Sequence, residues 1–119
     1  MNLYGAPPPL PGRVRGRNNA TDTTDKELIA TPGNSLALNI TQVVIFNAHA
    51  SAGTGVSLKS GATTIYGPIP APGNKGGCVL RFDPPLECAE DEAFQFAAED
   101  AVSTIYVSAL GYKAAPTTG

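Results

Sequence analysis

The chain has 119 residues, of which 42% are hydrophobic and only 15% are charged. This length favours one domain and is sufficient to bury a core without metal or disulfide staples. No apolar run approaches the roughly 20 residues that a membrane span needs. The first residues also lack the basic and apolar regions of a signal peptide. We therefore expect one domain made in a cytoplasm, with no membrane partner.

The net charge of −2 is unevenly distributed along the chain. Residues 1–20 contain Arg13, Arg15 and Arg17 and no acid, whereas residues 21–119 hold five bases and all ten acids and so carry −5. A basic segment of this kind can attract the acidic body of a neighbouring copy. Three arginines would neutralise few phosphates, so nucleic acid is not expected as a partner.

The N-terminal segment predicts an extended arm. Proline removes a backbone donor and fixes φ, so the run APPPLPG at residues 6–12 excludes a helix or a central strand. Polar residues without periodicity follow it. We expect residues 1–24 to be an extended arm that is either disordered or held by a partner. A ligand for an SH3-type domain is a further alternative. The residues expected to bind that partner are Pro8, Pro9, Leu10, Arg13, Arg15 and Arg17.

The rest of the chain indicates short strands separated by turns and loops. β-branched and aromatic residues dominate several runs, and clusters of glycine, proline and asparagine separate them. Long loops are expected at residues 48–55 and 67–77, and one helical turn at most near residues 87–93. The predicted strands, in chain order, are residues 26–30, 36–38, 40–46, 56–59, 63–66, 78–82, 93–97 and 102–112.

The alternation within these strands predicts which side chains are buried. In the last strand Ile105, Val107 and Ala109 share one face, and Tyr106 begins the other. Short strands at intervals of roughly ten residues are typical of a sandwich or small barrel. We expect an all-β protein with a single antiparallel β-sandwich, jelly-roll-like, at residues 25–113 and a tail at residues 114–119.

The sequence offers little that could support catalysis or metal binding. His49, the only histidine, lies in a small-residue loop with no recognisable nucleophile and base spacing. The loop acids lack the spacing of a calcium loop, and two cysteines are too few for a zinc site. Cys78 and Cys88 could be neighbours across a turn, but a cytoplasmic origin favours free thiols. We expect no enzymatic activity, catalytic residue, metal, cofactor or small-molecule substrate.

The predicted body resembles small bacteriophage virion proteins of the capsid decoration (cement) type. The resemblance covers about residues 36–113 and is one of layout and composition. The segments that carry it are ITQVVIFNA at 40–48, GVSLKSG at 55–61, TIYGPIP at 64–70, GCVLRFDPPL at 77–86 and YVSALGY at 106–112.

The resemblance implies a protein made in the host cytoplasm and carried on the exterior of the capsid. Its implied partners are the major capsid protein and copies of itself, as a dimer or trimer. The alternative is a tail or surface binding module for a receptor or glycan, for which Tyr66, Tyr106 and Tyr112 are the candidate aromatic platform. Capsid and tail locations stay open at this point.

Overall fold

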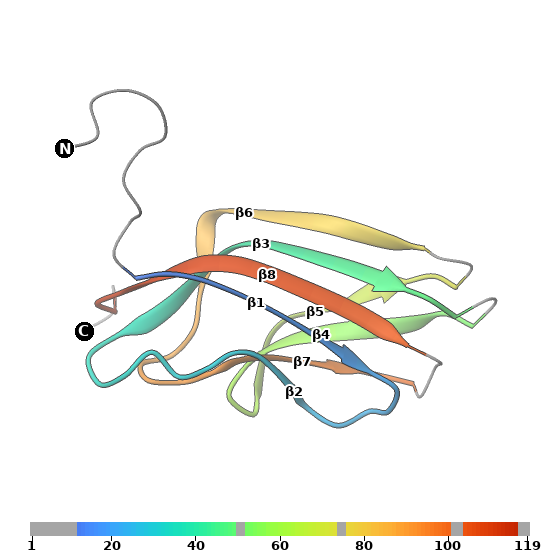
Figure 1. Cartoon of the computed structure of the whole chain (residues 1–119), viewed down its shortest axis with the longest axis horizontal. Helices are drawn as coiled ribbons and strands as arrows, with labels where there is room; N and C mark the ends of the chain where they lie inside the picture. The colour runs from blue at the N-terminus through green and yellow to red at the C-terminus, as the bar shows by residue number, and fades with distance from the viewer. Residues whose placement is uncertain (1–11, 50–51, 74–75, 101–103, 117–119) are drawn as a thin grey trace.

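The computed structural model describes residues 12–49, 52–73, 76–100 and 104–116, and these residues form an all-β sandwich (Figure 1). No helix with the length and hydropathy of a membrane span occurs in this part of the chain. The strands are β1 (Arg13–Ala20), β2 (Lys26–Ile29), β3 (Ala37–Asn47), β4 (Thr54–Ser60), β5 (Thr63–Ala71), β6 (Gly77–Glu87), β7 (Phe94–Ala98) and β8 (Ile105–Ala114).

The strands are arranged in two four-stranded antiparallel sheets. One sheet has the order β1-β8-β3-β6 and the other the order β2-β7-β4-β5. Consecutive strands therefore often lie in opposite sheets, which is the connectivity of an eight-stranded jelly roll. The expected fold class is confirmed.

Apolar side chains from both sheets fill the space between them. The alternation expected for β8 is confirmed, since Ile105, Val107 and Ala109 are buried and Tyr106 is 48% exposed. Phe94 and Phe96 of β7 are also fully buried. Each buried Phe, Leu, Ile or Val side chain stabilises the fold by about 1.5–3 kcal/mol relative to exposure. The other fully buried large side chains are Leu38, Ile40, Val43, Ile45, Val56 and Leu58.

The arm expected at residues 1–24 is wrong for residues 13–20. These residues form β1 and pair with β8 over the whole strand, from Arg13 opposite Tyr112 to Ala20 opposite Ile105. The strand forms because β8 offers an unpaired edge whose backbone groups need partners. Residues 1–11, including Pro8, Pro9 and Leu10, lie outside the described residues.

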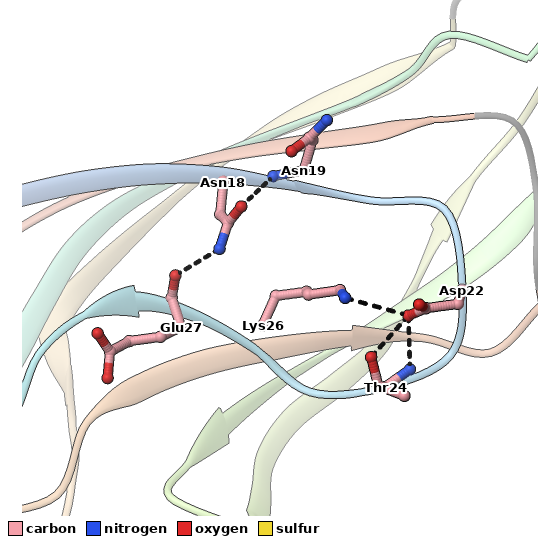
Figure 2. Close-up of polar contacts among 6 residues, drawn as sticks. All are labelled: Asn18, Asn19, Asp22, Thr24, Lys26 and Glu27. Atoms are coloured by element: carbon pink, nitrogen blue, oxygen red, sulfur yellow. Dashed lines mark hydrogen bonds and ion pairs between the residues drawn. The ribbon is translucent and has the colours of Figure 1, made fainter.

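A seam between β1 and β2 closes one side of the sandwich. The side-chain amide of Asn18 on β1 donates to the carbonyl of Glu27 on β2 at 2.9 Å (Figure 2). Gly16 permits the close approach, because a Cβ atom there would lie 1.8 Å from the carbonyl oxygen of Leu28. In the connecting turn, Asp22 accepts hydrogen bonds from the hydroxyl and backbone N–H of Thr24. These bonds, chiefly that of the hydroxyl, lower the pKa of Asp22.

Two proline-containing segments expected to lie outside strands are part of β5 and β6. β5 continues through Pro68 and Pro70, and β6 continues through Pro84 and Pro85 to Glu87. Both are edge strands, where a residue without an N–H removes no ladder bond on the open side. The register of β3 with β6 also shifts between Ile40 and Gln42, which accommodates the extra residues of β6.

Candidate binding face

The outer surface of the β1-β8-β3-β6 sheet combines arginine with exposed apolar side chains. Arg13, Arg15 and Arg17 project outward from β1 at alternate positions. Successive outward residues on one strand are roughly 7 Å apart. In the register, Arg15 lies opposite Leu110 and Arg17 lies opposite Ser108. The expected residues thus form one row along β1.

Two further strands extend this row across the sheet. Leu110 pairs with Gln42 of β3, which pairs in turn with Arg81 of β6. Phe46 of β3 pairs with Tyr106 of β8, and their ring centroids are 6.1 Å apart. We call this surface the basic face. It comprises Arg13, Arg15, Arg17, Gln42, Val44, Phe46, Val79, Arg81, Tyr106, Ser108 and Leu110.

The exposure of apolar groups is concentrated on the basic face. Five large apolar side chains are exposed among the described residues, and Tyr66 at 43% is the one that lies elsewhere. The four on the basic face are Val79 at 56%, Tyr106 at 48%, Leu110 at 44% and Phe46 at 38%. Exposed apolar groups gathered in one patch mark interaction sites more often than scattered ones do.

Its charge distinguishes the basic face equally well. The residues that define it include four of the eight basic residues, which leaves four bases against ten acids, or −6, on the rest of the chain, and the exposed Asp83 borders it two residues beyond Arg81. The ion pairs of the described residues join Lys26 to Asp22 and Lys59 to Asp25, and none involves an arginine of this face. The nearest acids along its strands are Asp83 and Glu87 of β6, beyond the paired position of Arg81.

The outer surface of the second sheet has a different composition. Its register aligns Glu27 of β2, Gln95 of β7 and Lys59 of β4, with Ser57 beside Ala97 in the adjacent row. These side chains are polar or small and include both charges, which is typical of a solvated surface. The two outer faces of the sandwich are therefore unequal, and the basic face is the better candidate for a partner.

The candidate catalytic histidine is in a loop, and the candidate glycan-binding tyrosines are divided between the two sheets. His49 accepts a hydrogen bond at Nδ1 from the backbone of Ala52, and Asn47 anchors the same loop. No three His, Cys, Asp or Glu side chains in the described segments are arranged to hold a metal ion. Tyr106 is on the basic face and Tyr112 lies on the same side of β8, opposite Arg13, whereas Tyr66 is on β5 against Phe82. The three tyrosines therefore do not share one platform.

Both cysteines are free thiols in this structure. Cys78 on β6 is half-buried against the core, in phase with Leu80 and Phe82. Cys88, directly after β6, is only 2% exposed. Burial raises the pKa of Cys88 to about 11 and also raises the pKa of Cys78. Neither cysteine has the lowered pKa of a reactive thiol.

Sequence reasoning identified the arginines of β1 but missed four residues of the basic face: Phe46, Val79, Arg81 and Leu110. A signal for two of them was present, because Val79 and Arg81 alternate with inward residues of β6. What brings them beside the arginine row is the order of strands in the sheet. That order depends on pairing between distant segments.

Comparisons with known proteins assign no family to this chain. Neither the family models nor the curated proteins gave a match. Among solved structures, the chain is similar to one from a cryo-EM structure of a virus-like particle. That particle is of the extra small virus of the giant freshwater prawn Macrobrachium rosenbergii. The identity is 14%, the alignment covers 94% of this chain and 85% of that chain, and the TM-score is 0.40.

Proposed function

We propose that this chain is a non-enzymatic structural protein of a virion, most specifically a capsid decoration (cement) protein. In this role it binds the exterior of an assembled phage head and stabilises it. The observation that carries the proposal is the jelly-roll sandwich with its basic, partly apolar outer face. Eight-stranded jelly rolls serve in viral capsids, in lectins and in cupins.

The position of the candidate surface favours a structural role over the role of a lectin or of a cupin. Apolar side chains fill the interior, where a cupin holds its metal and substrate. Exposed tyrosines on both sheets do not form one sugar-stacking platform. Arginine and aromatic residues on a flat outer surface are instead the residues enriched at protein interfaces. The partners we propose are the major capsid protein and copies of this chain.

The proposed mechanism is stabilisation by mass action. A protein that binds the assembled shell but not its separated subunits stabilises the shell by RT ln(1 + [L]/Kd) for each site. At a concentration of 100 Kd this contributes about 2.7 kcal/mol per site. Many weak contacts therefore suffice, provided that each copy binds only across assembled subunits. Residues 1–11, with Pro8, Pro9 and Leu10, would add a contact beyond the sandwich.

Quantitative mass spectrometry of density-purified particles from the source of this sequence tests the proposal. We expect the chain to band with the particles at a fixed copy number, in the tens or hundreds per particle. Biotinylation of intact particles should label Lys59, which lies on the outer surface of the second sheet in the same row as Gln95. Absence of the chain from particles would refute the virion role. Immunogold labelling confined to tails would replace the cement role by the tail module.

A further inference from the structure

We propose that the basic face is a docking surface for the acidic part of a second copy of this chain. This deepens the proposed function, because it identifies which surface joins copies to one another. Four arginines and four exposed apolar side chains share this face, and the described residues supply no ion-pair partner for the arginines. The carboxylates that would pair with these arginines must therefore come from another molecule.

Charge complementarity selects the second copy as the occupant. The face carries four positive charges while the rest of the chain carries −6. Two basic faces would repel each other if they met directly, since like charges oppose at both β1 and β6. The contact is therefore between the basic face of one copy and an acidic surface of the next. Charge-assisted hydrogen bonds from arginine to carboxylate would set the register of that contact.

The same charge argument disfavours nucleic acid as the occupant. Four arginines can neutralise only about four phosphates, which gives weak and strongly salt-dependent binding. A chain with a net charge of −2 also repels a polyanion at long range. A protein surface that presents carboxylates around apolar groups would match both the arginines and the exposed apolar side chains of the face.

The size of the face limits the strength of one contact. The four strands have 8 to 11 residues, so at about 3.3 Å per residue and about 4.8 Å between strands the sheet face covers roughly 500–700 Å². This is below the roughly 800 Å² per partner of a standard interface. A single contact should thus be weak and sensitive to salt. Each copy can use its basic face once and its acidic surface once, which doubles the area that it buries.

Light scattering at 50 and 500 mM salt, over a range of protein concentrations, tests the proposal. We expect full-length protein to form dimers or larger assemblies at 50 mM salt and to dissociate at 500 mM. The double variant Arg15→Gln/Arg17→Gln should weaken association at least tenfold. The control Lys26→Gln/Lys59→Gln removes the same charge away from the basic face and should change association less than twofold.

A second variant separates packing from charge. Val79→Ser/Leu110→Ser keeps every arginine and removes two exposed apolar side chains, and it should also weaken association. Circular dichroism of each variant should show an intact sandwich, because the substituted arginine, valine and leucine side chains are on the outer face of their sheet.

Several results would overturn the proposal. One is wild-type protein that stays monomeric at all concentrations. Another is association that the Arg15 and Arg17 substitutions leave unchanged.

Fluorescence anisotropy with a labelled single-stranded oligo-dT 20-mer tests nucleic acid as the other candidate occupant of the face. Tight binding by the wild type that is lost in the arginine variant, without self-association, would assign the face to nucleic acid. If the protein is monomeric in solution but present on particles, the proposed docking surface is refuted and the virion role stands. If it is oligomeric but absent from particles, the virion role is refuted and the docking surface stands.

Discussion

Replacement of Gly16 by alanine should detach β1 from the side of the sandwich. The added Cβ atom would lie 1.8 Å from the carbonyl oxygen of Leu28 and 2.8 Å from its carbonyl carbon. Both are backbone atoms of β2, so no side-chain rotation can relieve the overlap. One of the two strands must move, and the hydrogen bond from Asn18 to Glu27 lies beside the point of contact.

The cost follows from two contributions. Overpacking a tight site costs about 1–3 kcal/mol, and the rigid backbone contact places Gly16→Ala near the upper value. Loss of the Asn18 hydrogen bond would add about 1 kcal/mol. For a chain of this length, 1 kcal/mol corresponds to roughly 3–5 °C in Tm. We therefore expect a decrease of about 10 °C or more.

Thermal and urea unfolding followed by circular dichroism measure this change. Gly53→Ala is the matched control, because its added Cβ would meet its nearest atoms at 3.3–3.5 Å. That variant should stay within about 1 kcal/mol of the wild type. Hydrogen exchange should show faster exchange along β1 in Gly16→Ala alone. Equal stability of Gly16→Ala and wild type would refute the close packing of β1 on β2.

Three further predictions concern the loop, the thiols and the N-terminus. Asn47 is fully buried and donates to two backbone carbonyls at 2.9 Å. Asn47→Asp should lower the free energy of unfolding by about 3–5 kcal/mol at pH 7. The loss should be smaller at pH 4, where a protonated carboxyl can donate a hydrogen bond. Urea unfolding that shows the same difference between variant and wild type at both pH values would contradict this. Iodoacetamide at pH 8 should modify Cys78 well before Cys88 in folded protein, as mass spectrometry would show. Because burial raises the pKa of Cys88 from 9.0 to about 11, its contribution to stability is full below pH 9 and is lost as pH rises through 11; the same pH dependence in Cys88→Ala would refute this. Deletion of residues 1–11 should keep Tm within a few degrees, whereas deletion of residues 1–20 removes β1 and should cause aggregation through the exposed edge of β8; a soluble protein with unchanged Tm after the longer deletion would show that β1 is dispensable.

The fold class could be predicted because alternation within single strands is a local property. From Ile105 to Gly111 of β8 the buried and exposed residues follow strict period two, and Phe94 and Phe96 are buried at alternate positions in β7. Such patterns need no knowledge of which strand lies beside which. They establish the inward faces, and the inward faces of enough short strands require a sandwich.

β1 could not be predicted in the same way, because its inward residues are not a hydrophobic series. Val14, Gly16, Asn18 and Ala20 point inward, and only Val14 and Ala20 are apolar. Gly16 is required by the approach of β2, and Asn18 is satisfied by the carbonyl of Glu27. Both reasons lie in tertiary contacts, so the local sequence indicated an irregular segment.

The basic face was predictable only in part for a related reason. The arginine spacing is visible in the sequence, but the position of Arg81 on the same face depends on the order β1-β8-β3-β6. The prolines of β5 and β6 were misleading because a proline ends a central strand but is tolerated on an edge. Whether a strand is at an edge is again a property of the whole sheet.

The most direct test of the central claim is the temperature at which particles release their genome. Particles that lack this chain, made by deletion of its gene, should be compared with the same particles after addition of purified protein. Release can be followed with a dye that fluoresces on nucleic acid. The account predicts release at a lower temperature without the chain, restoration by wild-type protein, and incomplete restoration by Arg15→Gln/Arg17→Gln. Release at the same temperature with and without the chain would contradict a role in stabilising the shell.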